Sequence, residues 1–304
     1  MQAASLHTTV LLHETVQGLE PKVGGYYIDA TCGLGGHTEA LLEATAPSGR
    51  ILSVDRDPRA LSHARERLAR FGDRCRLVEA RFSELADIIE EPADGLLADL
   101  GVSSLQLDDA DRGFSFRADV ALDMRMSDRG MTAYELLQEV DESELTEILR
   151  DYGEVKRPRT VARAILRART SDALETTKDL VKAVEGVLPK KPGLHPATLV
   201  FQAIRIAVNR ELEELDTLLE HLPTLLAPKG RAAIISFHSL EDRKVKRSFR
   251  PPPLAPELRN LPIEQASHPM HAITRRPIVP SEEELSANSR SRSAKLRIAE
   301  RRGA

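Results

Sequence analysis

The sequence has few cysteines, no tryptophan and no long apolar run, and these absences exclude several classes of protein. Its two cysteines, Cys32 and Cys75, cannot form a disulfide framework or a CxxC pair, which favours a reducing, cytoplasmic compartment. No apolar run reaches the roughly 18–20 residues that cross a bilayer, and residues 1–10 lack the basic and apolar regions of a secretory signal. We therefore expect a cytoplasmic protein with no membrane partner.

Metal-binding patterns are also missing. The nine histidines are scattered, and none belongs to an HExxH motif. His268 and His271 lie in a proline-rich stretch without nearby cysteines, and turn capping and salt bridges explain the acidic run at 108–111 better than a bound cation does. We expect no metal site.

Length and charge describe a globular protein with one basic end. Its 304 residues suit one large domain or two modest ones, and 41% hydrophobic with 30% charged residues indicate a folded core. The net charge is −4, yet residues 238–304 hold fourteen Lys and Arg against eight Asp and Glu. An acidic body with a basic tail indicates either an anionic partner or a solvated surface, and charge alone does not choose between them.

Strand-like and helix-like segments alternate through the first hundred residues. This order predicts a parallel sheet with helices on both faces. Short apolar segments predict strands at 25–30, 50–55, 75–80, 95–100 and 231–237, with a closing antiparallel pair at 272–274 and 293–298. Periodic segments predict helices at 37–45, 58–71 and 84–90, and one long helix at 198–222.

The pattern changes in the middle of the chain. Residues 107–194 carry helical signals and no convincing strand, and Asp141 with Glu144 forms a capping box at the start of one helix. We therefore predict a sheet domain, residues 1–106 and 195–304, interrupted by an all-helical insertion, residues 107–194.

A glycine-rich loop follows the first predicted strand and opens a helix. Residues 33–36 (GLGG) let a ligand approach the backbone, and the helix start offers unsatisfied N–H groups. Asp55 ends the second strand, where a carboxylate can accept hydrogen bonds from both ribose hydroxyls of a nucleoside. Thr38 stands where a dinucleotide loop has its third glycine, and Asp29 suits an ammonium better than a phosphate. The loop favours S-adenosylmethionine over NAD; the alternative is a plain tight turn.

Seven long and chemically unusual blocks span nearly the whole chain. They are HTTVLLHE (7–14), DATCGLGGH (29–37), DRDPRAL (55–61), ADLGVSSLQLDDADRGFSFRADVALDMRM (98–126), HPATLVFQAIRIAVNRELEEL (195–215), SFHSLEDRKVK (236–246) and NSRSRSAKLR (288–297). Together they resemble the bacterial 16S ribosomal RNA cytosine-N4 methyltransferases. Cys32, Leu34 and Leu199 depart from that family's usual pattern. The resemblance implies a class I, Rossmann-like α/β methyltransferase fold with an inserted all-helical subdomain that recognises RNA.

The resemblance also implies contacts to S-adenosylmethionine. The positions that match the family are Gly35, Gly36, His37, Asp55, Phe82, Asp99 and Gln106. Asp99 ends the fourth predicted strand, at the sheet edge where ligands bind in open α/β sheets. The Phe82 ring could lie on adenine or pack in the core, and His37 could contact the ligand or only cap its helix.

Asp99 is the candidate catalytic residue. The implied reaction is attack of an exocyclic amine on a sulfonium methyl group, and a carboxylate that accepts the amine's N–H bonds can orient its lone pair. The prolines and stacking aromatic ring usual in amino-methyltransferases are missing after Asp99, so its carboxylate could bind amine, cofactor or both. Substrate contacts are predicted at Arg112, Phe114, Phe116, His238 and Ser239. The two rings could instead anchor the insertion.

A basic stripe in the insertion is the candidate RNA contact. Residues 156–169 contain six basic residues and no acidic one. Arg159, Arg163 and Arg167 follow a spacing of four along a predicted helix, and a phosphate backbone would relieve their repulsion. The alternative is a solvated helix face.

The resemblance implies an enzyme that methylates the N4 amine of a decoding-centre cytidine in 16S rRNA, with the small ribosomal subunit as partner. Two alternatives remain. One is a ribosome-assembly RNA-binding protein with a vestigial cofactor pocket, and the other is a DNA or small-molecule N-methyltransferase. The sequence allows a homodimer and does not determine the oligomeric state.

Overall fold

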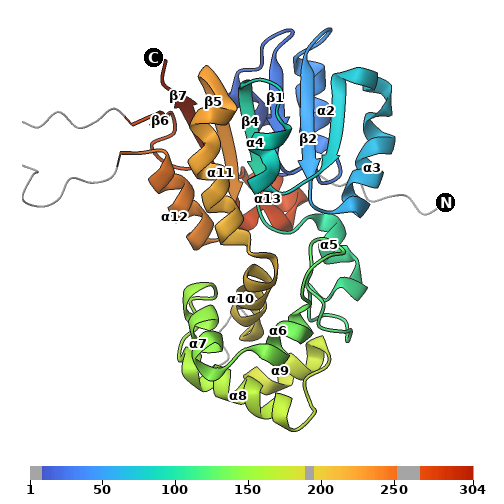
Figure 1. Cartoon of the computed structure of the whole chain (residues 1–304), viewed down its shortest axis with the longest axis vertical. Coiled ribbons are helices and arrows are strands. Elements are labelled where there is room, and N and C mark those ends of the chain that lie inside the picture. The colour runs from blue at the N-terminus through green and yellow to red at the C-terminus, as the bar shows by residue number, and fades with distance from the viewer. Residues whose placement is uncertain (1–8, 189–194, 252–267, 304) are drawn as a thin grey trace, which may run out of the picture. The chain divides into compact units, whose positions relative to one another are not determined.

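The chain divides into two compact units. The computed structural model describes residues 9–188, 195–251 and 268–303 (Figure 1). Met1–Gly101 and Glu213–Ala304 make up the sheet unit, and Val102–Leu212 makes up the helical unit. The helical unit therefore extends beyond the predicted insertion, residues 107–194, at both ends. The reason is a helix after residue 194, whose residues Val200 and Ile204 are buried in the core of the helical unit.

One seven-stranded sheet organises the sheet unit. The strand order is β3-β2-β1-β4-β5-β7-β6, and β7 runs antiparallel to both of its neighbours while the other pairs are parallel. The order reverses between β1 and β4, which is the switch point where open α/β sheets bind ligands. The predicted Rossmann-like fold and its closing antiparallel pair are confirmed. The strands are β1 (Tyr26–Asp29), β2 (Arg50–Asp55), β3 (Cys75–Glu79), β4 (Ala93–Asp99), β5 (Leu226–Ser236), β6 (Met270–Ala272) and β7 (Lys295–Arg301).

Helices cover both faces of this sheet. Along β4, Leu96 and Ala98 join one apolar core while Leu97 joins the other, because successive side chains of a strand point to opposite faces. The first core includes residues of α4 (Leu85–Ile88), α11 (Glu211–Leu225) and α12 (Ser239–Ser248). The second includes residues of α1 (Leu12–Leu19), α2 (Gly36–Ala44) and α3 (Pro58–Leu68). The remaining helices are α13 (Glu282–Ala287) and the 3-10 helices η1 (Ala69–Arg74), η2 (Phe82–Glu84) and η5 (Ser289–Ser293).

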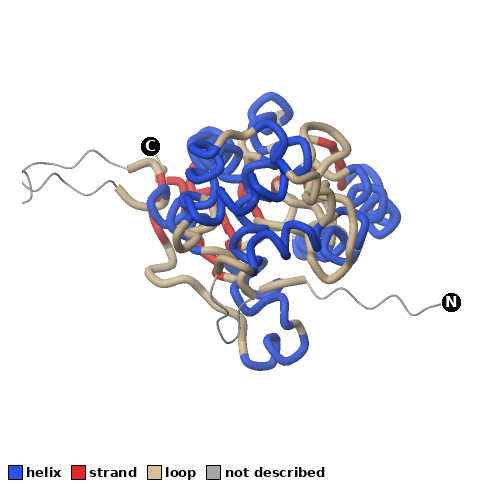
Figure 2. The backbone as a smooth tube through the Cα atoms, turned by 90° about the horizontal axis from the view of Figure 1, so that it is seen from below, coloured by secondary structure: helices blue, strands red, loops and turns tan. Residues whose placement is uncertain are grey.

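The helical unit has its own apolar core. Its described backbone is helix, turn and loop, with one isolated bridge between Ala121 and Thr176 (Figure 2). Its elements are α5 (Ser104–Asp108), η3 (Ala110–Arg112), α6 (Ala133–Glu139), α7 (Glu142–Asp151), α8 (Pro158–Thr170), α9 (Thr177–Glu185) and α10 (Ala197–Asn209). The buried side chains Leu137, Leu149 and Ile165 bring α6, α7 and α8 into one cluster.

Local sequence signals explain where several helices begin. Asp57 Oδ1 accepts the N–H of Arg59 at 3.0 Å, and Pro58 occupies the first position of α3, as predicted. The capping box of α7 is also confirmed, because Asp141 Oδ1 accepts the N–H of Glu144 at 2.8 Å while Glu144 Oε2 accepts the N–H of Asp141 at 3.1 Å.

The predicted long helix at 198–222 is wrong, because the chain forms two helices there. Arg210 adopts a left-handed conformation with φ 51°, which ends α10 before α11 begins at Glu211. The Asn209 side chain donates to Met124 O at 2.7 Å and accepts the N–H of Met126 at 2.8 Å. These hydrogen bonds fix the end of α10 at this position. Hydrophobic periodicity continues across the break, and for that reason the pattern alone did not reveal it.

Among the helices that the structure describes, none is both long and apolar enough to span a lipid bilayer.

Candidate active site

The first strand ends in a fully buried carboxyl that holds the glycine loop. Asp29 Oδ1 accepts the N–H of Thr31 at 3.0 Å, and Asp29 Oδ2 accepts the hydroxyl of Thr38 at 2.6 Å. Burial raises the pKa of Asp29 to about 6, against the lowering effect of these hydrogen bonds. Both carboxyl oxygens are thus engaged within the chain, so the structure uses Asp29 to fix the loop.

The glycines of this loop adopt conformations that other residues avoid. Gly33 and Gly35 have φ values of 51° and 79°, and a Cβ at Gly33 would meet only open space apart from Thr31 O at 4.0 Å. At Gly36 a Cβ would lie 2.0 Å from Thr9 Oγ1, so the packing there requires glycine. No side chain caps the start of α2, which leaves its first N–H groups facing this loop.

Asp55 closes the loop from the end of β2. Its Oδ2 accepts the N–H of Gly33 at 2.8 Å, and its Oδ1 accepts the N–H of Asp57 at 2.9 Å. Burial, supplemented by the charge of Asp57, raises the pKa of Asp55 to about 6. Each carboxylate oxygen can accept a second hydrogen bond, so Asp55 retains the capacity to bind a pair of hydroxyl donors.

Asp99 lies at the end of β4, the strand that pairs with β1 at the switch point. Its backbone N–H donates to Thr31 Oγ1 at 2.6 Å. Its carboxyl oxygen Oδ1 is buried, and no group in the described part of the chain hydrogen-bonds it. An unsatisfied buried acceptor is costly, which makes it a natural place for a ligand that donates hydrogen bonds.

The electrostatics around Asp99 favour a cationic ligand. Burial is the main reason that its pKa lies well above the usual value, and the charges of Asp29, Glu241 and Glu284 raise it further. A ligand cation beside Asp99 would offset this repulsion. S-adenosylmethionine carries a sulfonium, an ammonium and two ribose hydroxyls. The residues at Asp99, Asp55 and the glycine loop therefore fit it.

Three other predicted cofactor residues have local contacts. His37 is buried in the first turn of α2, and Phe82 packs against the core below α4. Gln106 belongs to the helical unit, where its Oε1 accepts the N–H of Ser103 at 2.9 Å in the capping box of α5. These local surroundings give each of the three residues a structural role. Cofactor contact at the three positions stays a prediction.

The loop after β5 contains a buried acid that the sequence analysis missed. Glu241, the third residue of α12, accepts the backbone N–H of Phe237 at 2.8 Å and lies 3.2 Å from His238 Nε2. His238 is thereby held as the N-cap of α12, and Ser239 is exposed at the first turn. The signal for Glu241 was present in the sequence, because a polar residue three positions before an acid is a capping-box pattern.

Most of the predicted base-stacking residues are packed within the helical unit. Arg112 is buried, donates to Arg125 O at 2.8 Å and lies 5.6 Å from the centre of the Phe114 ring. Phe114 is buried in the helical core. Phe116 is half-buried, with its ring 4.6 Å from that of His195. The structure therefore supports the anchoring alternative for both rings, because Phe116 also packs against the helical core, with its ring 5.2 Å from that of Phe201.

The basic stripe forms as predicted on α8. Arg159 and Arg163 are exposed, and both donate to Glu142 Oε1, at 2.7 and 3.0 Å. Arg167 is exposed one turn further on, while Val161 and Ile165 face the core. The negative charge of Glu142 offsets part of the repulsion between the arginines of the stripe. Arg159 and Arg163 in turn lower the pKa of Glu142.

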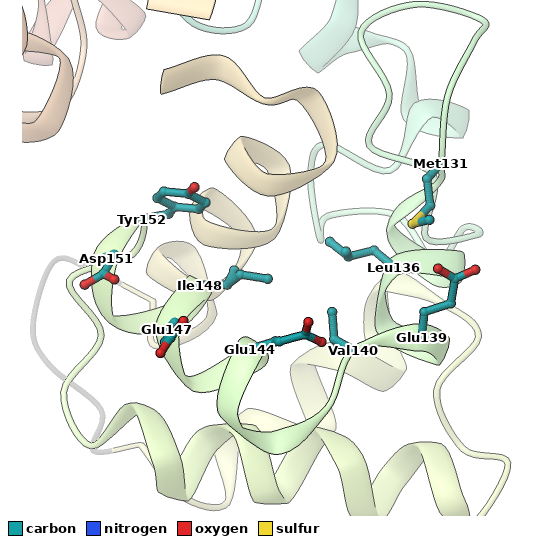
Figure 3. A pocket seen from close by; sticks show the side chains of 9 residues that line it. All are labelled: Met131, Leu136, Glu139, Val140, Glu144, Glu147, Ile148, Asp151 and Tyr152. Atoms are coloured by element: carbon teal, nitrogen blue, oxygen red, sulfur yellow. The ribbon is translucent and has the colours of Figure 1, made fainter. Parts of the chain in front are cut away.

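The helical unit also has an acidic groove, which we define by the side chains between α6 and α7. Half-buried Leu136 and Ile148 line it together with the exposed carboxylates of Glu139 and Glu147 (Figure 3). Its volume is about 610 Å³. Its complete lining is Met131, Leu136, Glu139, Val140, Glu144, Glu147, Ile148, Asp151 and Tyr152. A surface of this charge repels nucleic-acid phosphates.

Comparison with known proteins decides the family. Residues 4–302 match the MraW methylase family. The chain belongs to this family. It is 46% identical to the ribosomal RNA small subunit methyltransferase H of Magnetococcus marinus, covering 97% of this chain and 98% of that protein. It is 48% identical to the protein of the same name from Sorangium cellulosum, covering 98% of this chain and 91% of that one.

Membership of the MraW methylase family confirms the reaction class, S-adenosylmethionine-dependent methyl transfer, that the sequence blocks predicted. The geometry brings Gly35, Gly36, His37, Asp55 and Asp99 together at the carboxyl edge of the sheet.

Proposed function

We propose that this chain transfers a methyl group from S-adenosylmethionine to the exocyclic N4 amine of a cytidine in small-subunit ribosomal RNA. The observation that carries the proposal is the buried oxygen Asp99 Oδ1, which has no hydrogen-bond partner in the described part of the chain and ends the central strand β4. The names of the relatives support the RNA substrate.

The sheet unit would hold the methyl donor. In this proposal the Asp55 carboxylate accepts both ribose hydroxyls, and the open backbone at Gly33 receives the amino-acid part of the ligand. When bound there, S-adenosylmethionine supplies an electrophilic methyl group on a cationic sulfur. The positive charge of the donor also favours the ionised form of Asp99, which burial disfavours.

Asp99 would then act on the amine. Its Oδ1 accepts an N–H bond of the cytosine amine, which turns the nitrogen lone pair away from the ring and toward the methyl group. As the new N–C bond forms, positive charge develops on the nitrogen, and the adjacent carboxylate stabilises it. The raised pKa makes Asp99 Oδ1 a suitable acceptor for the proton that the methylated amine loses.

The helical unit would contact the RNA. Arg159, Arg163 and Arg167 offer cations to phosphates along one face of α8. The acidic groove between α6 and α7 is unsuited to that task. The proposal also gives the small ribosomal subunit as partner and the cytoplasm as the place of action, and it is compatible with a monomer or a homodimer.

The direct test is methyl transfer. The enzyme is incubated with labelled S-adenosylmethionine and small subunits from cells that lack this enzyme, and the modified nucleotide is mapped. We expect one N4-methylated cytidine in the 16S rRNA. Binding of S-adenosylhomocysteine without transfer to any RNA would instead support a ribosome-assembly protein, and transfer to DNA or free nucleosides would support the third alternative.

A further inference from the structure

One hydroxyl group joins the glycine loop to the catalytic strand. Thr31 lies in the loop between β1 and α2, and its Oγ1 accepts the backbone N–H of Asp99 at 2.6 Å. The Thr31 N–H donates to Asp29 Oδ1 at 3.0 Å. Thr31 therefore links the buried Asp29 carboxyl to the backbone of Asp99 on the adjacent strand.

The direction of these bonds is determined by their partners. The Asp99 N–H is the donor and Thr31 Oγ1 the acceptor, while Thr31 is itself held by its own N–H, which donates to Asp29 Oδ1. Asp29 cannot shift to relieve the bond, because Thr38 donates to its other oxygen at 2.6 Å. Asp29 itself is completely buried. Thr31 thus connects the backbone of Asp99 to a fixed anchor.

This anchor matters because Asp99 lacks one of its own. No described group hydrogen-bonds its Oδ1. Two residues further on, Gly101 has φ 89°, where the chain leaves β4. The Thr31 bond fixes the backbone at the point where the strand gives way to a turn. We propose that Thr31 is a positioning residue that sets the Asp99 carboxyl at the distance the amine requires; this inference rests on the proposed function.

Loss of the Thr31 hydroxyl should affect the methyl-transfer step and the binding of the donor to different degrees. A misplaced Asp99 slows the chemical step more than it weakens donor binding, because Asp55 and the glycine backbone keep their own contacts. Displacing a catalytic group by about 1 Å can lower a rate by about 100-fold. Thr31→Val keeps the shape of the side chain and removes the hydroxyl, whereas Thr31→Ser keeps the hydroxyl.

The test compares three variants in single-turnover methyl transfer to small subunits and in calorimetric binding of S-adenosylhomocysteine. We expect Thr31→Val to lower the transfer rate about 10- to 100-fold, with less than about a 3-fold change in binding. Thr31→Ser should restore the rate to within about 3-fold of the wild type. Thr45→Val is the matched control, because the buried Thr45 hydroxyl donates to Leu41 O at 2.7 Å and contacts neither Asp29 nor Asp99. It should slow transfer much less than Thr31→Val.

Several results would overturn the inference. These are an unchanged rate in Thr31→Val, an equal loss in Thr45→Val and Thr31→Val, or a loss of binding that accounts for the whole effect. Thermal unfolding of each variant checks that the sheet unit remains folded. If the wild type itself transfers no methyl group to RNA, the proposed function fails. If the wild type is active and Thr31→Val is equally active, the proposed function stands and only the inference about Thr31 fails.

Discussion

The two units use charged residues in opposite ways. In the sheet unit, Asp29, Asp55 and Asp99 lie at the ends of adjacent strands, and burial raises the pKa of each. In the helical unit, Arg159 and Arg163 lie at the surface and share Glu142. Asp29 is fully buried and the other two are partly buried, so water screens these carboxyls less than it screens surface charges, and they act strongly over short distances.

The surface cations act differently. Each contributes little alone, is screened by salt, and becomes effective when several meet a charged polymer together. The comparison therefore predicts large, salt-insensitive effects for substitutions in the sheet unit. It predicts small, additive and salt-sensitive effects in the helical unit.

Asp99→Ala should have the largest effect. It removes the acceptor that orients the amine and stabilises its charge, so we expect turnover to fall by at least roughly 100- to 1,000-fold. The measurement is transfer of labelled methyl to small subunits. Asp87→Asn, an exposed acid of α4, is the control and should be neutral. Wild-type turnover in Asp99→Ala would remove this residue from the mechanism.

Asp55→Ala should weaken donor binding. Loss of charge-assisted hydrogen bonds to two hydroxyls costs roughly 1–3 kcal/mol, or about 5- to 150-fold in affinity. Calorimetry with S-adenosylhomocysteine measures this change at low and high salt, and the loss should be the same in both. Unchanged affinity in a folded variant would contradict the assignment of Asp55 to the ribose.

Donor binding should also depend on pH. The folded pKa of Asp55 is about 6, and only the ionised carboxylate accepts from both hydroxyls. The affinity for S-adenosylhomocysteine should therefore be highest above pH 6 and fall as the pH is lowered through that value. Asp55→Asn provides the comparison, since it keeps every other buried carboxyl. Equal pH dependence in both proteins would assign the titration to another group.

Replacing Arg159, Arg163 and Arg167 by Gln should weaken RNA binding and flatten its salt dependence. Loss of up to three phosphate contacts lowers the slope of log affinity against log salt by about 2. Donor affinity should not change. Gln at Arg65, Arg70 and Arg76 of the sheet unit makes the same change in net charge and serves as the control. If the slope does not change, the stripe does not touch RNA.

Glu142→Gln should have the smallest effect and the opposite sign. Glu142 holds Arg159 and Arg163 in ion pairs, so its neutralisation makes both arginines available to phosphate. We expect RNA affinity to rise about 2- to 3-fold at low salt, and the gain to disappear at high salt. Glu147→Gln, on the same helix but without contact to either arginine, controls for the change in net charge.

The centre of the sheet could be predicted because β1, β2, β4 and β5 are buried on both faces over most of their length and are therefore largely apolar. Short polar helices were harder. The predictions omitted α12 and α13, whose sequences are rich in charge and have no clear apolar stripe. The break at Arg210 also escaped prediction, because a left-handed residue other than glycine leaves no mark in hydrophobic periodicity.

The site could be predicted in part. Gly35, Asp55 and Asp99 follow from strand ends and loop composition. The buried state of Arg112 and the link from Thr31 to Asp99 do not, because they depend on contacts between segments that are distant in the sequence. Sequence patterns report spacing along an element. They do not report which hydroxyl of a loop meets the next strand.

The charge distribution of the helical unit bears on how the protein is oriented as it approaches RNA. Residues 133–151 hold seven acidic residues and one basic residue, whereas residues 156–169 hold six basic residues and no acidic one. Two neighbouring stretches of opposite sign give this unit an electric dipole. If α8 contacts RNA as proposed, the field of the polyanion exerts a torque on this dipole that turns α8 toward the RNA and the acidic groove away from it before any contact forms. Collisions thus become productive more often than random orientation would allow.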